Sequence, residues 1–495
     1  MKHVIFGAGL WLLILAPAEV VRAAHQTPVV SAIDLTGSVP YRIQLRPYDF
    51  GPEELPTLQS YAAGVQDGKW VLISGRTNGL HGFTSNSSTN FPAAAQNREV
   101  WVIDPVSRQS WSRPLDDPTS GLSEATILSL TPTNTQFYQR GDRLYMTGGY
   151  GVAPAGGFNT FDTLTAIDLP DMIEWVVSGT GSASATVRQI TDPALKVTGG
   201  AMYEIDGRTH LVFGQDFVGG YNPSKNGAYT NQVRSFNIVD DGSVLSIDTP
   251  SSTTPDPAYR RRDLNVFPVI RSRPGGLENE LVVLSGVFTE TNGAWTVPVE
   301  VDDTGQTTMA DPNLPSTFKQ GMNNYHSAKL GLYSEGSGAM HEVLFGGISL
   351  QYIDPGTGLI ATDDDFPFIN EITSIAIDSA GNYTQHLLGE FPELLDNEGK
   401  RLRFGANAEF FHAEGIPIYD NGVIKFDELT GQTVLGYLFG GIAANAPHVR
   451  GVPGTASAAS DLIFEVVLVP VPEPGAWVLV VFAVIAMLHA TRLRG

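Results

Sequence analysis

Three consecutive aspartates have the residue type that could bind a metal ion. Asp363, Asp364 and Asp365 lie a few residues after Asp354, and carboxylate oxygens are the ligands that Ca²⁺ prefers. The run lacks the alternating aspartates and the Gly of a calcium-binding loop. The sequence therefore favours a solvated acidic loop, with a Ca²⁺ site as the weaker alternative and no other cofactor.

Arginine is also concentrated in one stretch, where several guanidinium groups could clamp a carboxylate. The residues are Arg260, Arg261, Arg262, Arg271 and Arg273. The favoured interpretation is an exposed loop whose arginines form ion pairs and keep the protein soluble.

The sequence carries no motif for a known reaction. It contains no Cys, which excludes disulfides, thiolate metal sites and cysteine nucleophiles. No His-Glu-x-x-His spacing, Gly-x-Ser-x-Gly elbow or Gly-rich phosphate loop is present. Four histidines fall in or beside expected strands, where a hydrogen-bonded structural role is expected: His326, His341, His386 and His412. We therefore expect no catalytic residue and a protein that is not an enzyme.

Composition narrows the partners and the fold class. The 495 residues carry a formal net charge of −22, with 42% hydrophobic and 17% charged residues. Such an acidic chain has ample apolar material for a core and argues against binding to nucleic acid, so neutral or cationic partners are expected. The 53 Gly and 32 Pro residues favour short strands joined by tight turns.

An internal repeat sets the architecture. A short apolar strand that runs into Gly recurs six times, ending at Gly75, Gly149, Gly214, Gly286, Gly347 and Gly441. In the first five units a further strand ends in an acidic turn, at Asp104, Asp168, Asp240, Asp302 and Asp378. Trp111 and Trp175 occupy comparable places in the strand that follows this turn. Six units of roughly 70 residues with four strands each predict an all-β, six-bladed β-propeller of antiparallel blades, with seven blades left open.

The Gly-Gly doublets at 148–149, 346–347 and 440–441, followed at a distance by a strand, an Asp turn and Trp, resemble the kelch pattern in a degenerate form. Only two units keep the Trp, and the units exceed the roughly 50 residues of a kelch repeat. A propeller of another lineage therefore stays open. We assign residues 24–470 to the propeller and expect an N-terminal strand, within residues 29–45, to complete the last blade beside the strand at 462–468.

The N-terminus has the order of a secretory signal peptide. Lys2 precedes an apolar run over residues 4–16, and small residues follow. We expect a signal helix within residues 1–23 and cleavage at Ala23.

The C-terminus carries a second targeting pattern. Pro472, Glu473 and Pro474 precede an apolar run over residues 476–490, and Arg492 and Arg494 follow it. The run is shorter than the usual span of about 17 to 25 residues. Residues 471–495 resemble the PEP-CTERM sorting tail, in which a short membrane helix and a basic terminus follow a Pro-Glu-Pro motif.

This resemblance implies an exported precursor held in the inner membrane of a Gram-negative-type bacterium. An exosortase-type transpeptidase would process it at or near the Pro-Glu-Pro motif. The mature protein would then reside at the cell surface or in the extracellular matrix. A plain single-span anchor is the alternative.

Long loops are the expected recognition elements, since a rigid scaffold presents variable loops. They span residues 77–98, 152–161, 215–232, 349–370 and 443–460, and their candidate ligand contacts are Phe83, Phe91, Tyr221, Tyr229 and Tyr352. We expect a non-enzymatic propeller that binds polysaccharide or protein through one face. The alternative is a secreted polysaccharide lyase or glycoside hydrolase, which a carboxylate pair or a Tyr, His and Arg cluster at the channel mouth would favour.

Overall fold

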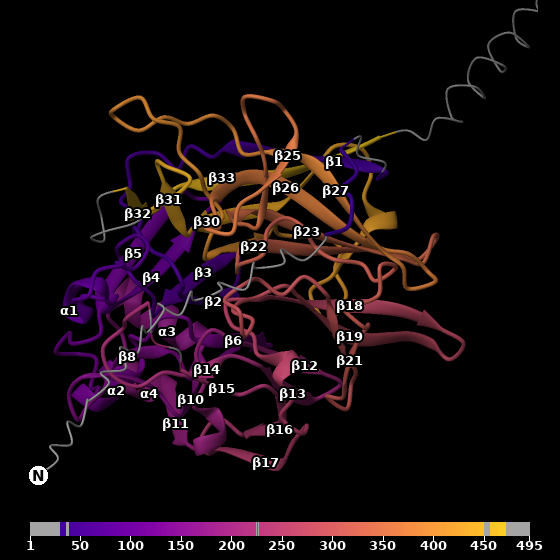
Figure 1. Ribbon diagram of the computed structural model, residues 1–495. Helices are drawn as coiled ribbons and strands as arrows, with labels where there is room; N and C mark the ends of the chain where they lie inside the picture. The colour runs from indigo at the N-terminus through magenta and orange to yellow at the C-terminus, as the bar shows by residue number, and fades with distance from the viewer. Residues whose placement is uncertain (1–29, 36–38, 224, 226, 450–455, 472–495) are drawn as a thin grey trace, which may run out of the picture.

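The chain forms a ring of six four-stranded antiparallel sheets, which are the blades of a β-propeller (Figure 1). The computed structural model describes residues 30–35, 39–223, 225, 227–449 and 456–471. In Figure 1 the chain passes from the first blade at the left, through blades at the bottom and right, to the last blades at the top. The all-β, six-bladed prediction is confirmed, with six blades rather than seven.

Each blade has four strands, which we number from the axis outward, and the strands at each position are named from the first blade to the sixth. The innermost strands are β2 (Ala62–Gln66), β6 (Gln136–Arg140), β12 (Ala201–Ile205), β18 (Asn265–Arg273), β22 (Ala328–Ser334) and β28 (Ala408–His412). The second strands are β3 (Lys69–Ile73), β7 (Arg143–Thr147), β13 (Arg208–Val212), β19 (Gly276–Leu284), β23 (Ala339–Ile348) and β30 (Thr433–Gly440). The third strands are β4 (Glu99–Asp104), β10 (Thr163–Asp168), β16 (Val233–Asp240), β20 (Val299–Val301), β26 (Phe368–Ile377) and β33 (Ile463–Pro470). The outer strands are β5 (Gln109–Pro114), β11 (Val187–Thr191), β17 (Leu245–Ser252), β21 (Thr307–Met309), β27 (Tyr383–Glu390) and β1 (Tyr41–Pro47).

The last blade is built from both ends of the propeller. β1 pairs antiparallel with β33, from Tyr41 opposite Pro470 to Pro47 opposite Phe464. This pairing covers an edge of β33 that would otherwise be open to another chain. Residues 30–35 take a different place, since Asp34 forms a parallel bridge with His386 at the outer edge of the fifth blade.

Short elements decorate the loops between the blade strands. Four two-stranded ribbons are β8 (Tyr150–Val152) with β9 (Phe158–Thr160), β14 (Gln215–Asp216) with β15 (Ala228–Tyr229), β24 (Gln351–Ile353) with β25 (Ile360–Thr362), and β31 (Ile442–Ala444) with β32 (Ser457–Ala459). The α-helices are α1 (Ser87–Asn90), α2 (Glu124–Ser129), α3 (Leu169–Ser178) and α4 (Ala183–Thr186). The 3₁₀ helices are η1 (Ala93–Ala95), η2 (Pro193–Leu195), η3 (Pro257–Tyr259) and η4 (Phe426–Glu428), and β29 (Ile424–Lys425) adds a parallel strand to β22.

The recurring Gly has a conformational cause. In every blade the second strand ends in two consecutive residues with positive φ: Ser74-Gly75, Gly148-Gly149, Phe213-Gly214, Ser285-Gly286, Gly346-Gly347 and Gly440-Gly441. The left-handed conformation disfavours residues with a Cβ. At Gly441, a Cβ would also lie 2.6 Å from the Ala406 carbonyl oxygen. The second position is Gly in all six blades, whereas the first tolerates Ser or Phe.

The hydrophobic core is divided among the six interfaces between blades. The interface between the last and first blades closes the ring, and there Trp70 stacks on Phe411 with ring centroids 4.3 Å apart. Trp111 and Trp175 both contact the cluster between the first and second blades. The prediction that Trp175 lies in a strand is wrong, because Leu169-Pro-Asp begins helix α3 and Trp175 packs from that helix. Pro at the first turn and Gly179 at the end are ordinary helix signals.

A closed ring of backbone hydrogen bonds surrounds the propeller axis. A residue shortly before each innermost strand donates its N–H to the carbonyl of the corresponding residue in the preceding blade. The donor–acceptor pairs are Asn134–Ser60 (3.3 Å), Gly199–Asn134 (3.2 Å), Asp263–Gly199 (2.7 Å), His326–Asp263 (2.8 Å), Asn407–His326 (3.1 Å) and Ser60–Asn407 (3.2 Å). We call these six residues the axial ring.

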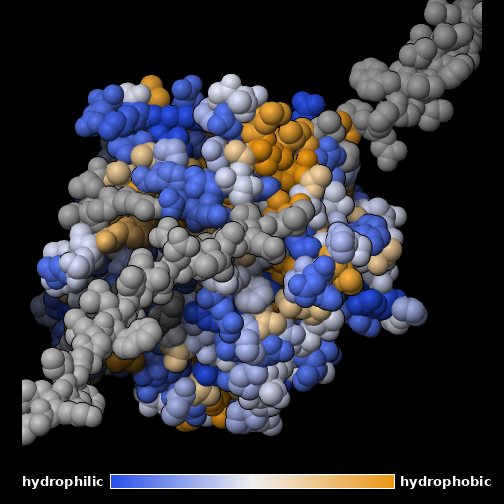
Figure 2. Space-filling view, viewed as in Figure 1, coloured by the Kyte–Doolittle hydropathy of each residue, from blue (hydrophilic) through white to orange (hydrophobic). Residues whose placement is uncertain are grey.

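The targeting segments lie outside the described residues. These are residues 1–23 with Ala23, and residues 472–495 with the Pro-Glu-Pro motif, Arg492 and Arg494. No helix within the described part of the chain is long and apolar enough to cross a membrane. The face shown in Figure 2 is mainly hydrophilic, with apolar residues gathered toward its upper right.

The Gly motif can be tested with a matched pair of substitutions. Gly415 has φ +78° with nothing within 4 Å of a Cβ, whereas Gly441 has φ +81° and the Ala406 contact. Gly415→Ala should cost about 1 kcal/mol of the free energy of unfolding through backbone strain alone. Gly441→Ala should cost about 3 kcal/mol or more, because the clash adds to the strain. Urea unfolding measures both, and equal costs would contradict this explanation.

Candidate functional site

The long loops emerge together on one face of the propeller. Each connects the second strand of a blade to the third, and the six second strands all run toward the same end of the axis. The loops comprise residues 74–98, 148–162, 213–232, 285–298, 349–367 and 441–462. We call this side the loop face, and nearly all of the residues that the sequence marks as recognition loops belong to it.

The loops surround a cavity of about 400 Å³, the loop-face cavity. Its walls are largely aromatic, with His81, Phe83, Phe91, Tyr150, Phe217, Tyr221, Phe288, Tyr325, Phe366 and Phe368 among the lining residues. Its volume lies within the range of small-molecule sites, roughly 300–1,000 Å³. The cavity is therefore a concave, mainly apolar site with room for a small ligand.

Members of the axial ring form the floor of this cavity. Asn134, Gly199 and Asp263 line it, and Asn134 Nδ2 donates to Asp263 Oδ1 at 3.1 Å. This bond passes beside Gly199, where a Cβ would lie 3.0 Å from Asp263 Oδ1. Burial raises the pKa of the Asp263 carboxyl, while Arg262 and Asn134 act to lower it. The floor of the cavity thus presents the Asp263 carboxylate and the Asn134 amide, which are joined by a hydrogen bond.

Arg262 lies beside Asp263 and is fixed from several sides. Its Nε lies 3.3 Å from Asp263 Oδ2, and its Nη1 donates to Gln215 Oε1 at 2.9 Å. The guanidinium carbon lies 5.1 Å from the centre of the Phe288 ring and 5.7 Å from that of Tyr229. These contacts orient a guanidinium toward the cavity and offset most of the cost of burying its charge.

His81 and Tyr221 form a hydrogen-bonded pair in the cavity wall. His81 Nδ1 lies 3.1 Å from the Gly82 carbonyl, so that nitrogen carries the proton, and Nε2 accepts from the Tyr221 hydroxyl at 3.1 Å. Burial, together with the nearby Arg262 and Arg76, lowers the pKa of His81 to about 4, although the hydrogen bond to the Gly82 carbonyl acts to raise it. Burial raises the pKa of Tyr221 to about 12. At neutral pH the pair is uncharged, with its proton positions fixed.

The rim of the loop-face cavity is acidic. Asp364 and Asp365 are exposed and line it. Asp363 Oδ2 lies 3.0 Å from His448 Nε2, and Asp363 Oδ1 accepts from the Asp365 N–H. Within the residues that the structure describes, no three His, Cys, Asp or Glu side chains converge to hold a metal ion. The aspartate run adds negative charge to the rim of the cavity.

The predicted ligand contacts separate into three groups. Phe83, Phe91 and Tyr221 line the cavity. Tyr229 lies beside it, where its hydroxyl accepts from the Phe288 N–H at 3.3 Å. Tyr352 does not line the cavity and packs in another cluster with Ile33 and Met322.

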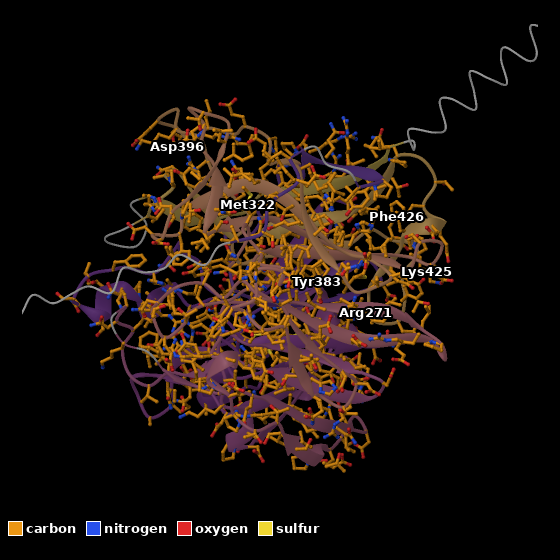
Figure 3. The ribbon with its side chains drawn as sticks, turned by 45° about the vertical axis from the view of Figure 1, so that its right-hand side comes forward. Arg271, Met322, Tyr383, Asp396, Lys425 and Phe426 are labelled. Atoms are coloured by element: carbon orange, nitrogen blue, oxygen red, sulfur yellow. The ribbon has the colours of Figure 1, made fainter. Side chains whose placement is uncertain are left out.

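The arginine group does not form an exposed loop as expected. Arg261 is fully buried beneath Trp295, with its guanidinium carbon 4.9 Å from a ring centre. The guanidinium carbon of Arg260 lies 4.0 Å from the centre of the Tyr229 ring. Arg271 and Arg273 lie on β18, away from the cavity, and both pair with Glu280. Arg271 Nη2 also donates a hydrogen bond to the Tyr383 hydroxyl at 3.3 Å, and both residues are labelled in Figure 3.

Sequence reasoning missed the polar floor and part of the wall. Asn134, Asp263 and Tyr325 belong to three different blades and lie before the innermost strands. Their one available signal was position, because each precedes the first strand of a repeat unit. An alignment of the six units on that strand would have placed them together.

Comparisons with known proteins give a distant likeness of fold. No protein-family model matches the chain, and no curated protein matches it. A solved structure described as "Structure of YjhT" matches with a TM-score of 0.43 and 10% sequence identity, covering 85% of this chain and 100% of that one. The six-bladed propeller is structurally similar to that protein at low sequence identity. The likeness concerns the fold alone.

Proposed function

We propose that this propeller is an exported, surface- or matrix-associated protein that binds a neutral or cationic sugar unit of an extracellular polysaccharide in the loop-face cavity. The observation that carries the proposal is the combination of aromatic walls with a few fixed polar groups at the floor. This is the usual construction of a small-ligand site, in which apolar surface gives affinity and convergent polar groups fix orientation.

Aromatic side chains suit a sugar ring because the ring presents an apolar face of C–H groups. Phe83 is 43% exposed, and Tyr221 and Phe366 are half-buried at the cavity. These side chains already lie in a packed wall, so binding costs little conformational entropy.

The floor supplies hydrogen-bond partners for sugar hydroxyls. Asp263 accepts, Asn134 and Gln215 offer amides, and the guanidinium of Arg262 donates. Most of these groups are held by one another, as the Asn134–Asp263 and Arg262–Gln215 bonds show. Such preorganised groups give orientation without a large ordering cost.

Charge selects against an anionic ligand. The cavity lining contains three carboxylates, from Asp263, Asp364 and Asp365, against the single guanidinium of Arg262 among its described residues. The whole chain adds a net charge of −22. A neutral or amino sugar avoids the repulsion that an acidic polysaccharide would meet.

An enzymatic function is the second candidate. The loop-face cavity is lined by Tyr221, His81 and Arg262. A secreted lyase or glycoside hydrolase would use a cluster of these residue types. The binding role is preferred because Arg262 is tied to Asp263 and Gln215. Release of reducing ends or unsaturated products from a bound polysaccharide would favour the enzyme.

Export rests on the two targeting patterns. The propeller ends where the sorting tail is expected to begin, since the Val471 N–H donates to the Pro40 carbonyl at 2.9 Å and closes the last blade. The Pro-Glu-Pro motif follows directly. An exosortase-type transpeptidase is the partner proposed for this segment, with the inner membrane as its location before processing.

Binding can be tested on a glycan array and then by calorimetry with the best neutral or amino glycan. Phe83→Ala should weaken binding by roughly 5- to 50-fold, because it removes an exposed stacking surface without disturbing the core. Tyr352→Ala is the control, as Tyr352 lies outside the cavity. Equal effects of the two substitutions, or binding confined to acidic glycans, would contradict the proposal.

Sorting is tested by cell fractionation with mass spectrometry of the C-terminus. The wild-type protein should appear at the cell surface or in the matrix without its apolar tail. Glu473→Ala should remain uncut in the membrane fraction. An intact wild-type chain in the cytoplasm, or processing that ignores the substitution, would rule out this part of the proposal.

A further inference from the structure

A second cavity of about 560 Å³ occupies the propeller channel on the other side of the axial ring. It is lined by the six innermost strands and, at its outer end, by Ile418 and residues 420–423. Ile418 at that end is 42% exposed. We call this space the channel cavity, and it opens on the side opposite the loop face.

Three titratable side chains meet on its wall. Lys329 projects from β22, Glu409 from β28, and His326 belongs to the axial ring. Lys329 Nζ lies 3.2 Å from His326 Nε2, and that imidazole nitrogen lies 3.6 Å from Glu409 Oε1. The Lys329 amine and the Glu409 carboxylate therefore both lie close to the same nitrogen of the His326 imidazole, so the three groups can share a proton.

Strand alternation explains why a lysine faces the channel. Ala328, Leu330 and Leu332 are buried in the core between the fifth and sixth blades. Lys329 and Gly331 therefore point to the opposite side, toward the axis. Both residues line the channel cavity.

The environment favours uncharged forms of the amine and the imidazole. Burial lowers the pKa of Lys329, although Glu409 acts to raise it. Burial and the nearby Lys329 hold the pKa of His326 well below its usual value. Burial raises the pKa of Glu409 to about 7, although Lys329 acts to lower it. Among the described residues, the hydrogen-bond partner of the amine is the imidazole and no carboxylate pairs directly with it.

We propose that Lys329 is a reactive amine that forms a reversible imine with a small neutral aldehyde in the channel cavity, with His326 as proton acceptor and Glu409 as the group that stabilises the protonated imidazole. Strand β22 supplies the nucleophile, and the axial ring fixes the base beside it. This site is independent of sugar binding at the loop face.

The reaction balances without a redox partner. The Lys329 nitrogen attacks the carbonyl carbon, a C–N bond forms, and the carbonyl oxygen takes a proton to give a carbinolamine. His326 Nε2 removes a proton from the nitrogen, and Glu409 at 3.6 Å stabilises the imidazolium. The C–O bond then breaks as a proton passes to the departing hydroxyl, and water leaves the imine.

A structural role alone is a weaker explanation. A buried ammonium is costly unless a carboxylate pairs with it directly. Here Glu409 lies within 3.6 Å of the imidazole, and the amine hydrogen-bonds to that imidazole. Titratable groups with perturbed pKa values that face a cavity are typical of reactive sites.

The test uses the full-length protein with glyceraldehyde and cyanoborohydride at pH 7, which reduces imines to stable adducts. Peptide mapping by mass spectrometry compares Lys329 with Lys400, an exposed lysine paired with Glu398 at 2.8 Å. Lys329 should be labelled at least about tenfold faster, because the Glu398 carboxylate raises the pKa of Lys400. Labelling of Lys329 no faster than Lys400 would overturn the proposal.

Variants separate the roles. His326→Gln should slow labelling of Lys329 about tenfold or more while leaving Lys400 unchanged. Lys329→Met should abolish the fast adduct and keep the affinity for glycan, since Lys329 does not line the loop-face cavity. An unchanged Lys329 rate in His326→Gln would contradict the proposed base, and a fast adduct elsewhere in Lys329→Met would contradict the site. The wild-type comparison stands even if a variant does not fold.

Discussion

The axial ring of six hydrogen bonds is the constraint on which the rest of the structure depends. Each blade donates one N–H to the blade before it, and the bond from Ser60 to Asn407 joins the first blade to the last. At the periphery, β1 closes the same junction by pairing with β33. Buried backbone groups must be paired. The ring meets this demand at the axis, where the six sheets come closest together.

The ring also decides where chemistry is available. Its backbone groups are used in bonds between blades, so the channel is lined at this level by side chains. Asn134, Gly199 and Asp263 line both cavities, whereas His326 and Asn407 line only the channel cavity. The two cavities differ in character. The first is aromatic and suits a sugar ring, and the second brings an amine beside a base.

Much of the fold could be predicted because its signals are local and repeat. Six strands ending in Gly gave the number of blades, since the pair of positive-φ residues recurs in each unit. The site was predictable only in part: aromatic loop residues such as Phe83 stand out, but Asp263 and Lys329 gain meaning only when blades meet. Trp175 was misplaced because its apolar stretch follows the acidic turn at Asp168, as a strand does in the other units. The helix signals there are Pro170 and Gly179. Asp263 and Lys329 were missed for a different reason, because contacts between units of roughly 70 residues leave no local pattern.

Amide hydrogen exchange tests the role of the axial ring most directly. If the ring holds the blades together, the six ring amides should exchange only through global unfolding and show free energies equal within about 1 kcal/mol. Loop-face amides, such as that of Phe83, should exchange through smaller openings. Fast and unequal exchange of the six ring amides, with the blade cores still protected, would contradict the account.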